Sequence, residues 1–318
     1  MSMKILACSA VLLAACALAP LATARNAPPA AATAPATAVA PLPPLWKVTG
    51  PGDSRVYLLG SFHLLTPKDY PLSPDAEQAF EAARRVVFEL SPEDMQSPQL
   101  ASRMVQAAVR TDGSELRRDL DAPIWQKLQA YATANRLPLE QLQGMQAWFV
   151  GLSISVSQMQ KMGLDPALGL DRHFMEAAAK AGKPASGLED IDTQIGTLAG
   201  MGASEQRQMV AEALEQADKG DDQARGLHEA WRRGDDRFLW NTMAVQMKQQ
   251  YPQLYQRINT GRNEAWVPKL VPYLQAGQGS TLVVVGTLHL LGSDGVVEKL
   301  RAKGYKVERV CTGCKLKR

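Results

Sequence analysis

An eight-residue pattern occurs twice in this chain, about 220 residues apart, at 58–65 and at 284–291. Both copies read apolar, apolar, Gly, Ser or Thr, apolar, His, Leu, Leu, and their histidines, His63 and His289, are two of only four in the chain. The two copies can act together only if the fold brings two similar halves side by side. The pattern therefore predicts two imidazoles at one site.

The residues around each copy predict the same order of elements. An apolar strand ends at each Gly-x-x-His motif, and a helix and a second strand follow. We expect these elements at 55–60, 74–83 and 86–90, and again at 281–285, 296–302 and 305–310. A strand at 45–48 makes a hairpin with the first of them, and most of 98–275 is expected to be helical, with helices over 139–162 and 236–258 among others. Met201, Met209, Met243 and Met247 are expected to fill the core. The fold class is therefore α/β (α+β): two pseudo-symmetric strand–GxxH–helix–strand halves share one central sheet, with a large helical insertion between them.

The first 24 residues predict a signal peptide. Lys4 precedes an apolar, Ala-rich stretch over 5–21, which is short for a membrane span. An Ala-Thr-Ala cleavage pattern at 22–24 would start the mature chain at Arg25. The alternative is a lipobox, because Leu-Ala-Ala-Cys ends at Cys16, which would then carry a lipid anchor to the membrane. Both interpretations predict an exported protein, either periplasmic or lipid-anchored in the cell envelope.

An Ala/Pro-rich linker is expected over 25–44, followed by one large domain over 45–318. The net charge is +3 and no run of Lys or Arg occurs, so no nucleic-acid partner is expected. The domain holds two cysteines, Cys311 and Cys314, which would pair with each other as a structural clip in an oxidising compartment. A redox motif is the alternative, but such a motif belongs at a helix N-terminus rather than after the last strand.

Three residues are the leading candidates for chemistry. His63 and His289 each follow a strand end, where sheets of this type usually place their sites, and a neutral imidazole can bind a metal ion or act as a base. Glu89 ends the strand at 86–90, among apolar neighbours that make an unpaired carboxylate costly. Two histidines and a glutamate form a common three-ligand metal set. The alternatives are hydrogen-bonded structural histidines and a solvent-facing glutamate.

Other polar residues have weaker signals. Arg262 could stabilise an oxyanion and Asn263 adjoins it, although a helix-start loop with Asn263 as its cap explains both. Asp171 could bind a metal ion or orient a histidine, and helix capping explains it equally well. The same alternatives apply to Glu189 and Gln194. Structural or solvent-exposed roles are expected for His173, His228 and Glu308. The chain lacks the HExxH, GxSxG, P-loop and dinucleotide-binding patterns.

Taken together, several of these segments resemble the TraB/GumN family, in order and approximate spacing, from Trp46 to Val310. The matching segments are 57–63, 87–90, 169–171, 187–189 with Gln194, 262–263 and 285–292. The paired GxxH motifs carry most of the resemblance. The chain departs from the family pattern at Asp190, where a threonine is expected.

The resemblance implies a fold shared with the Tiki proteases and, more distantly, with erythromycin esterase-like and ChaN-like proteins. Tiki proteins are membrane-anchored metalloproteases that use the two GxxH histidines and a glutamate with manganese or cobalt. Carried over to this chain, the resemblance implies a divalent metal ion at His63, His289 and Glu89, with zinc as a further candidate.

We therefore expect an exported metal-dependent hydrolase, with peptidase as the first choice, that acts on a peptide or small molecule of the cell envelope. The expected catalytic residues are Glu89, Arg262 and Asn263, and the expected metal ligands are His63, His289, Glu89 and Asp171. The alternative is a non-catalytic envelope protein that uses the same cleft to bind a ligand or to assist assembly.

Overall fold

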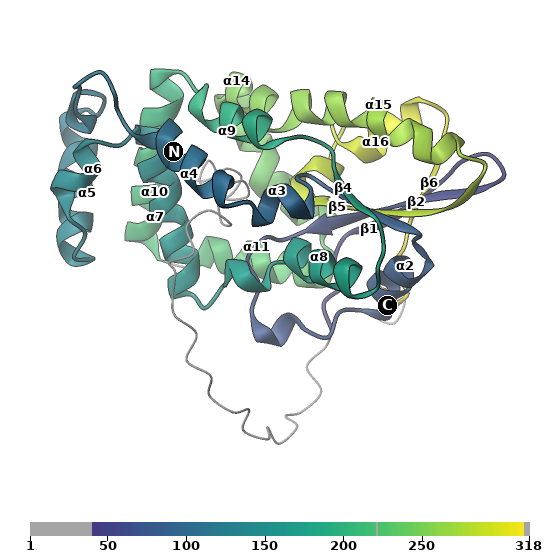
Figure 1. The fold of residues 1–318 in the computed structure, drawn as a ribbon. Helices are drawn as coiled ribbons and strands as arrows, with labels where there is room; N and C mark the ends of the chain where they lie inside the picture. Colours follow the sequence, from purple (N-terminus) through teal and green to yellow (C-terminus); the bar gives the residue numbers. More distant parts are fainter. Residues whose placement is uncertain (1–39, 221, 315–318) are drawn as a thin grey trace.

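The computed structural model describes residues 40–220 and 222–314 (Figure 1). Its centre is a six-stranded sheet with the order β4-β3-β5-β2-β1-β6. The strands are β1 (Leu45–Thr49), β2 (Asp53–Ser61), β3 (Arg85–Phe88), β4 (Ala185–Gly187), β5 (Gln278–Gly286) and β6 (Lys306–Arg309). The predicted mixed α/β class is confirmed.

The strands that precede the two GxxH motifs, β2 and β5, are parallel neighbours at the middle of the sheet. Their register pairs Leu59 with Val284 and Ser61 with Gly286, so the two motifs leave the sheet at the same edge. β5 is buried from Ser280 to its end, as expected for a parallel strand covered on both faces. β3 adds to the other side of β5 in parallel, while β1 pairs antiparallel with both β2 and β6.

Helices cover both faces of the sheet (Figure 1). α15 (Gly261–Gln275) and α16 (Val296–Ala302) lie above it in this view, and α2 (Pro74–Ala82) and α8 (Leu170–Lys180) lie below it. The helix that follows β2 and the helix that follows β5 thus lie on opposite faces. The pseudo-symmetry of the two halves stays a prediction.

Part of the helical insertion extends away from the sheet on the left of Figure 1, where α5, α7 and α10 form a small core of their own. The remaining helices are α3 (Pro92–Gln96), α4 (Pro98–Ala108), α5 (Ala122–Ala134), α6 (Leu139–Gln143), α7 (Ala147–Lys161), α9 (Ile191–Ala199), α10 (Ala203–Lys219), α11 (Asp222–Arg233), α12 (Asp236–Trp240), α13 (Gln246–Gln250) and α14 (Pro252–Tyr255). Short 3-10 turns are η2 (Pro67–Asp69), η3 (Leu116–Arg118), η4 (Pro166–Leu168) and η7 (Thr287–Leu290), and π-helical turns are η5 (Asn241–Val245) and η6 (Gln256–Thr260).

Two helices predicted as continuous are broken. The helix expected over 139–162 is divided into α6 and α7, because α6 ends at Gly144 and the chain is extended at Gln146. The helix expected over 236–258 is interrupted at Tyr251, since Pro252 lacks the N–H that would continue it. Four methionines expected to fill the core are all buried, namely Met201, Met209, Met243 and Met247.

The ends of the domain are held by specific contacts. Residues 41–44, assigned from the sequence to the linker, are buried, and the Leu42 N–H donates to the Arg232 carbonyl at 2.7 Å. These residues therefore pack against the rest of the domain; the rest of the expected linker and the signal peptide lie outside the described residues. At the other end, the predicted Cys311–Cys314 disulfide is confirmed. Within the described part of the chain, no helix combines the length and apolar character that crossing a membrane requires.

Candidate functional site

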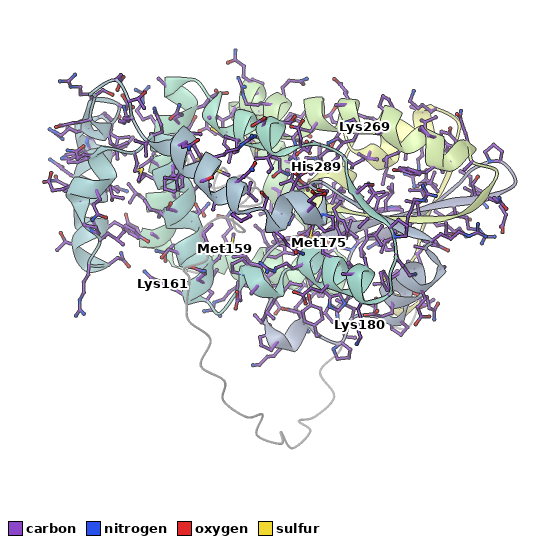
Figure 2. The ribbon with its side chains drawn as sticks, viewed as in Figure 1. Met159, Lys161, Met175, Lys180, Lys269 and His289 are labelled. Atoms are coloured by element: carbon purple, nitrogen blue, oxygen red, sulfur yellow. A yellow bond between two sulfur atoms is a disulfide. The ribbon has the colours of Figure 1, made fainter. Side chains whose placement is uncertain are left out.

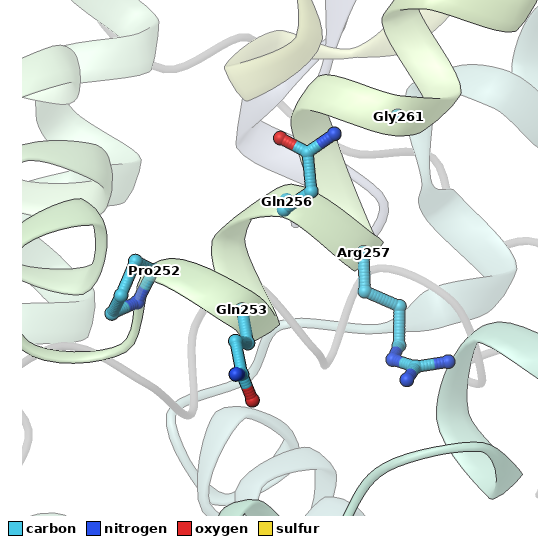
Figure 3. A pocket seen from close by; sticks show the side chains of 5 residues that line it. All are labelled: Pro252, Gln253, Gln256, Arg257 and Gly261. Carbon is cyan, nitrogen blue, oxygen red and sulfur yellow. The ribbon is translucent and has the colours of Figure 1, made fainter.

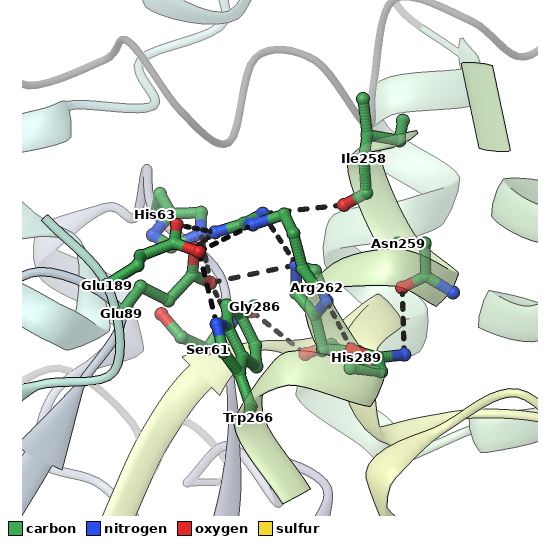
Figure 4. Close-up of polar contacts among 12 residues, drawn as sticks. Ser61, His63, Glu89, Glu189, Ile258, Asn259, Arg262, Trp266, Gly286 and His289 are labelled. Atoms are coloured by element: carbon green, nitrogen blue, oxygen red, sulfur yellow. Dashed lines mark hydrogen bonds and ion pairs between the residues drawn. The ribbon is translucent and has the colours of Figure 1, made fainter. Parts of the chain in front are cut away.

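The six residues expected to carry chemistry converge beyond the carboxyl ends of the parallel strands. Figure 4 labels four of them, His63, Glu89, Arg262 and His289. His63 follows β2, Glu89 follows β3, and His289 lies in η7 directly after β5. The first turns of two helices complete the cluster: α8 contributes Asp171, and α15 contributes Arg262 and Asn263. Figure 2 shows His289 near the middle of the molecule.

A close backbone approach positions α8 against the first GxxH motif. The Leu170 N–H donates to the Phe62 carbonyl at 3.1 Å. A Cβ atom on Gly169 would lie 2.2 Å from the carbonyl oxygen of His63, so only glycine allows this approach. The contact brings Asp171, two residues further on, to the imidazole of His63.

His63 is held through one ring nitrogen and is free at the other. Its Nδ1 forms a short hydrogen bond with Oδ2 of Asp171, which also accepts a 2.6 Å hydrogen bond from the Ser61 hydroxyl. Its Nε2 is buried without a hydrogen-bond partner among the described residues and lies 4.0 Å from Oε1 of Glu89. Burial lowers the pKa of His63, but the charges of Asp171 and Glu89 outweigh it, so the pKa lies above its ordinary value.

The surroundings of His289 lower its pKa, whereas those of His63 raise its pKa. Its Nδ1 lies 2.7 Å from Oδ1 of Asn263, and its Nε2 lies 3.0 Å from Nη1 of Arg262. A guanidinium can only donate, so Nε2 is the acceptor and Nδ1 carries the proton that it donates to Asn263. Burial and the Arg262 charge lower the pKa of His289 to about 3, so the ring is neutral at physiological pH.

Arg262 lies between two buried carboxylates. Its Nη2 donates to Glu89 at 2.5 Å and also to Glu189, while its Nε donates to Glu189 at 3.1 Å. Trp266 donates its indole N–H to the same Glu189 carboxylate at 3.1 Å. Burial lowers the pKa of Arg262, but the two carboxylates outweigh it and the pKa lies above its ordinary value. The guanidinium is therefore a permanent charge at the centre of the cluster.

Glu89 faces Arg262, His63 and His289. Its Oε1 accepts the Gly286 N–H at 2.7 Å and lies 4.0 Å from the Nε2 atoms of both His63 and His289. Burial raises its pKa, but Arg262 and the two histidines outweigh burial and lower it to about 2. Glu89 is thus ionised, and both histidines approach it.

The fit of this cluster to a metal ion can be judged from its donors. Each imidazole has its Nδ1 held by an oxygen acceptor and its Nε2 turned towards Glu89, which is how metal-binding histidines are usually held. However, the Nε2 lone pair of His289 already accepts from Arg262. No group of three or more His, Cys, Asp and Glu side chains in residues 40–220 and 222–314 is arranged to hold a metal ion. As they are placed, the residues do not fit a metal ion.

Asp171 was expected as a metal ligand and Asn263 as a catalytic residue, but in the structure each of them contacts Nδ1 of a histidine. Asp171 contacts Nδ1 of His63, so it orients this imidazole rather than lying beside its free nitrogen. Asn263 orients His289 in the same way. Glu189 has only a weak signal in the sequence, because a glutamate there could equally be a helix cap. In the structure, the residue that caps α9 is Asp190, which accepts from the Thr193 N–H.

The other two histidines lie outside this cluster. His173 packs against Tyr70 and Phe174, and His228 hydrogen-bonds Asp69 at 2.9 Å. Two cavities also lie elsewhere. One of about 600 Å³ opens beside η6 and is lined by Pro252, Gln253, Gln256, Arg257 and Gly261 (Figure 3). The other, of about 380 Å³, lies between η2, the end of α7 and α11.

Comparison with known proteins identifies the class to which this fold and site belong. The family model of the TraB/PrgY/gumN family matches residues 44–309, so the chain belongs to this family, as the motifs predicted. It is 25% identical to the uncharacterized protein YbaP of Escherichia coli (strain K12) over 286 residues, which cover 81% of this chain and 92% of the relative. YbaP of Shigella flexneri is similar to the same extent. No solved structure matches the chain.

Proposed function

We propose that this chain is an exported hydrolase of peptide or other acyl bonds, with its reaction centre at His63, Glu89, Arg262 and His289. The observation that carries the proposal is the free Nε2 of His63, buried beside a permanent guanidinium charge while Nδ1 is fixed by Asp171. A carboxylate on Nδ1 holds an imidazole in the tautomer and orientation that suit proton transfer at Nε2.

Each residue has a distinct part in such a reaction. Nε2 of His63 removes a proton from the attacking water and later returns it to the leaving group, while Asp171 stabilises the imidazolium formed between the two steps. Arg262 favours the negative charge that develops on the carbonyl oxygen through its positive charge, because its N–H groups already donate to Glu89, Glu189, His289 and the Ile258 carbonyl. Glu89 and Glu189 hold the guanidinium in place, and neutral His289 receives one of its N–H groups.

The metal dependence expected from the sequence is a separate question. A metal ion at the two Nε2 atoms and Glu89 would require Arg262 to leave His289, so we derive no step through a metal ion. Metal analysis of protein purified without a His-tag, and assays with chelator or with added manganese, cobalt or zinc, test that expectation independently of the hydrolase proposal.

The hydrolase proposal is tested with fluorogenic peptides and p-nitrophenyl esters. His63→Ala should lower the rate by about a hundredfold or more, which is the usual contribution of a general base. His173→Ala is the matched control, since this histidine lies outside the cluster and its loss should leave the rate unchanged. Equal hydrolysis by the wild type and by the His63→Ala and His289→Ala variants would contradict the proposal and favour the non-catalytic binding or assembly protein.

Export is supported by the Cys311–Cys314 disulfide, because such bonds persist mainly in oxidising compartments. The segment that would direct export lies outside the described residues. Mass spectrometry of the mature protein distinguishes a lipidated Cys16, a free N-terminus at Arg25 and an uncleaved chain. An uncleaved chain recovered from the cytoplasm would contradict export.

A further inference from the structure

Both copies of the duplicated pattern carry a hydroxyl residue directly after the glycine, Ser61 in the first copy and Thr287 in the second. The proposed reaction uses neither of them. Ser61 is 0% exposed and Thr287 is 2% exposed, so each hydroxyl needs a hydrogen-bond partner inside the protein. The partners of the two hydroxyls therefore show what this position of the pattern does.

The Ser61 hydroxyl holds the carboxylate that orients His63. It donates to Oδ2 of Asp171 at 2.6 Å, and the same oxygen forms the short hydrogen bond with Nδ1 of His63. The outer torsion of an aspartate side chain is broad and roughly twofold, so a carboxylate with a single partner can turn. A second partner on the same oxygen selects the orientation in which this oxygen faces the imidazole.

The Thr287 hydroxyl holds Ser61 in turn. It donates to the Ser61 carbonyl at 2.9 Å, across the ends of the adjacent strands β2 and β5. A Cβ atom on Gly60 would lie 2.8 Å from the Thr287 hydroxyl oxygen, so the glycine leaves room for this hydroxyl. The second copy of the pattern is thereby tied to the first.

We propose that Ser61 and Thr287 are positioning residues for His63. Thr287 fixes the backbone of Ser61, Ser61 fixes the carboxylate of Asp171, and this carboxylate holds the imidazole with its Nε2 free. Neither hydroxyl makes or breaks a bond in the reaction, and each acts through His63. The inference rests on the proposed function for its effect on the rate, whereas the order of the imidazole can be measured without any reaction.

The test uses Ser61→Ala and Thr287→Val, which remove one hydroxyl each. Thr281→Val is the matched control, because Thr281 is buried in the same strand as the end of the second copy but pairs with Val56 and Arg85, towards the other end of the strand.

The first measurement is NMR of protein labelled at histidine, with His63→Ala to assign the signal. The His63 ring should give one sharp set of signals in the wild type and in the control. Ser61→Ala should broaden or double these signals, because the carboxylate then samples more than one orientation, and Thr287→Val should do so to a smaller extent.

The second measurement is the hydrolysis assay. Ser61→Ala should lower kcat between about tenfold and a hundredfold without raising KM, because a misplaced general base slows the reaction and leaves binding intact. In the double variant, the losses of Ser61→Ala and Thr287→Val should combine to less than their product, since one hydroxyl acts through the other.

Wild-type His63 signals in both single variants, the same change in Thr281→Val, or an unchanged kcat in Ser61→Ala would overturn the proposal. A wild type that hydrolyses none of the substrates would contradict the proposed function instead, and the NMR spectra would then decide the positioning role on their own.

Discussion

The guanidinium of Arg262 offers the sharpest test of the cluster, because both of its carboxylate partners are buried. The side chains of Arg262, Glu89 and Glu189 are 6%, 7% and 4% exposed. Arg262→Met keeps much of the side-chain volume but removes the charge and every donor. Two buried carboxylates would then face each other without a cation.

The expected loss of stability follows from two independent arguments. Removing one partner of a buried ion pair costs about 3–5 kcal/mol. The pKa of Glu89 is lowered from 4.5 to about 2, with Arg262 as the largest favourable cause, and this difference alone corresponds to about 3 kcal/mol at neutral pH. By contrast, Arg103 pairs with Asp192 where their side chains are 44% and 78% exposed, and such a pair contributes at most about 1 kcal/mol.

The contribution of Glu89 to the unfolding free energy depends on pH with a definite sign. The folded pKa of Glu89 lies below its ordinary value, so its contribution is fully present above about pH 4.5 and is lost as the pH falls towards 2. Without Arg262, burial dominates and Glu89 prefers its neutral form. The difference in unfolding free energy between wild type and Arg262→Met should therefore be large at pH 7.5 and smaller at pH 3.5.

The assay is urea unfolding followed by tryptophan fluorescence at both pH values, with Arg103→Met as the exposed control. Arg262→Met should lose about 3–5 kcal/mol at pH 7.5, and Arg103→Met should lose no more than about 1 kcal/mol. The same loss at both pH values would refute the reasoning, as would a loss in Arg262→Met no larger than that of the control.

Three further perturbations test neighbouring parts of the structure. Asp171→Asn removes the charge that raises the pKa of His63, so an NMR titration should show that pKa falling, and an unchanged pKa would contradict the contact. Gly169→Ala places a methyl group 2.2 Å from a carbonyl oxygen and should cost about 1–3 kcal/mol in urea unfolding. Gly196→Ala, with no atom within 4 Å of the new methyl, should cost nothing. Reducing the C-terminal disulfide, whose cysteines are 3 residues apart, should cost no more than about 2 kcal/mol because the loop is short.

The strands were predictable because their signals are local. An apolar β-branched run bounded by glycine predicts β5, and it ends at Gly286 in the structure. The adjacency of β2 and β5 followed from the duplicated pattern rather than from either strand alone. The broken helices were harder, although Pro252 was a visible signal that the long helix would stop there. The π-helical turn η6, just before Arg262, has no comparable local signature.

The residues of the candidate site could be predicted from the sequence, but which of them contact one another could not. Which histidine faces Asp171 and which faces Asn263 depends on contacts between residues that are 108 and 26 positions apart. No sequence pattern distinguishes a carboxylate that orients an imidazole from one that binds beside its free nitrogen. The contact of Arg262 with Glu189 likewise joins residues that are 73 positions apart.

The two GxxH histidines show why a repeated motif need not repeat its chemistry. The motif fixes where each imidazole leaves the sheet, whereas the partners of the two rings come from different helices, α8 for His63 and α15 for His289. The charges of Asp171 and Glu89 outweigh burial and raise the pKa of His63, while burial and the guanidinium beside Nε2 lower the pKa of His289 to about 3. Titratable groups whose environments move their pKa values apart are typical of acid–base sites. In the proposed reaction, His63 is therefore the histidine that exchanges protons, while His289 stays neutral and contacts Arg262.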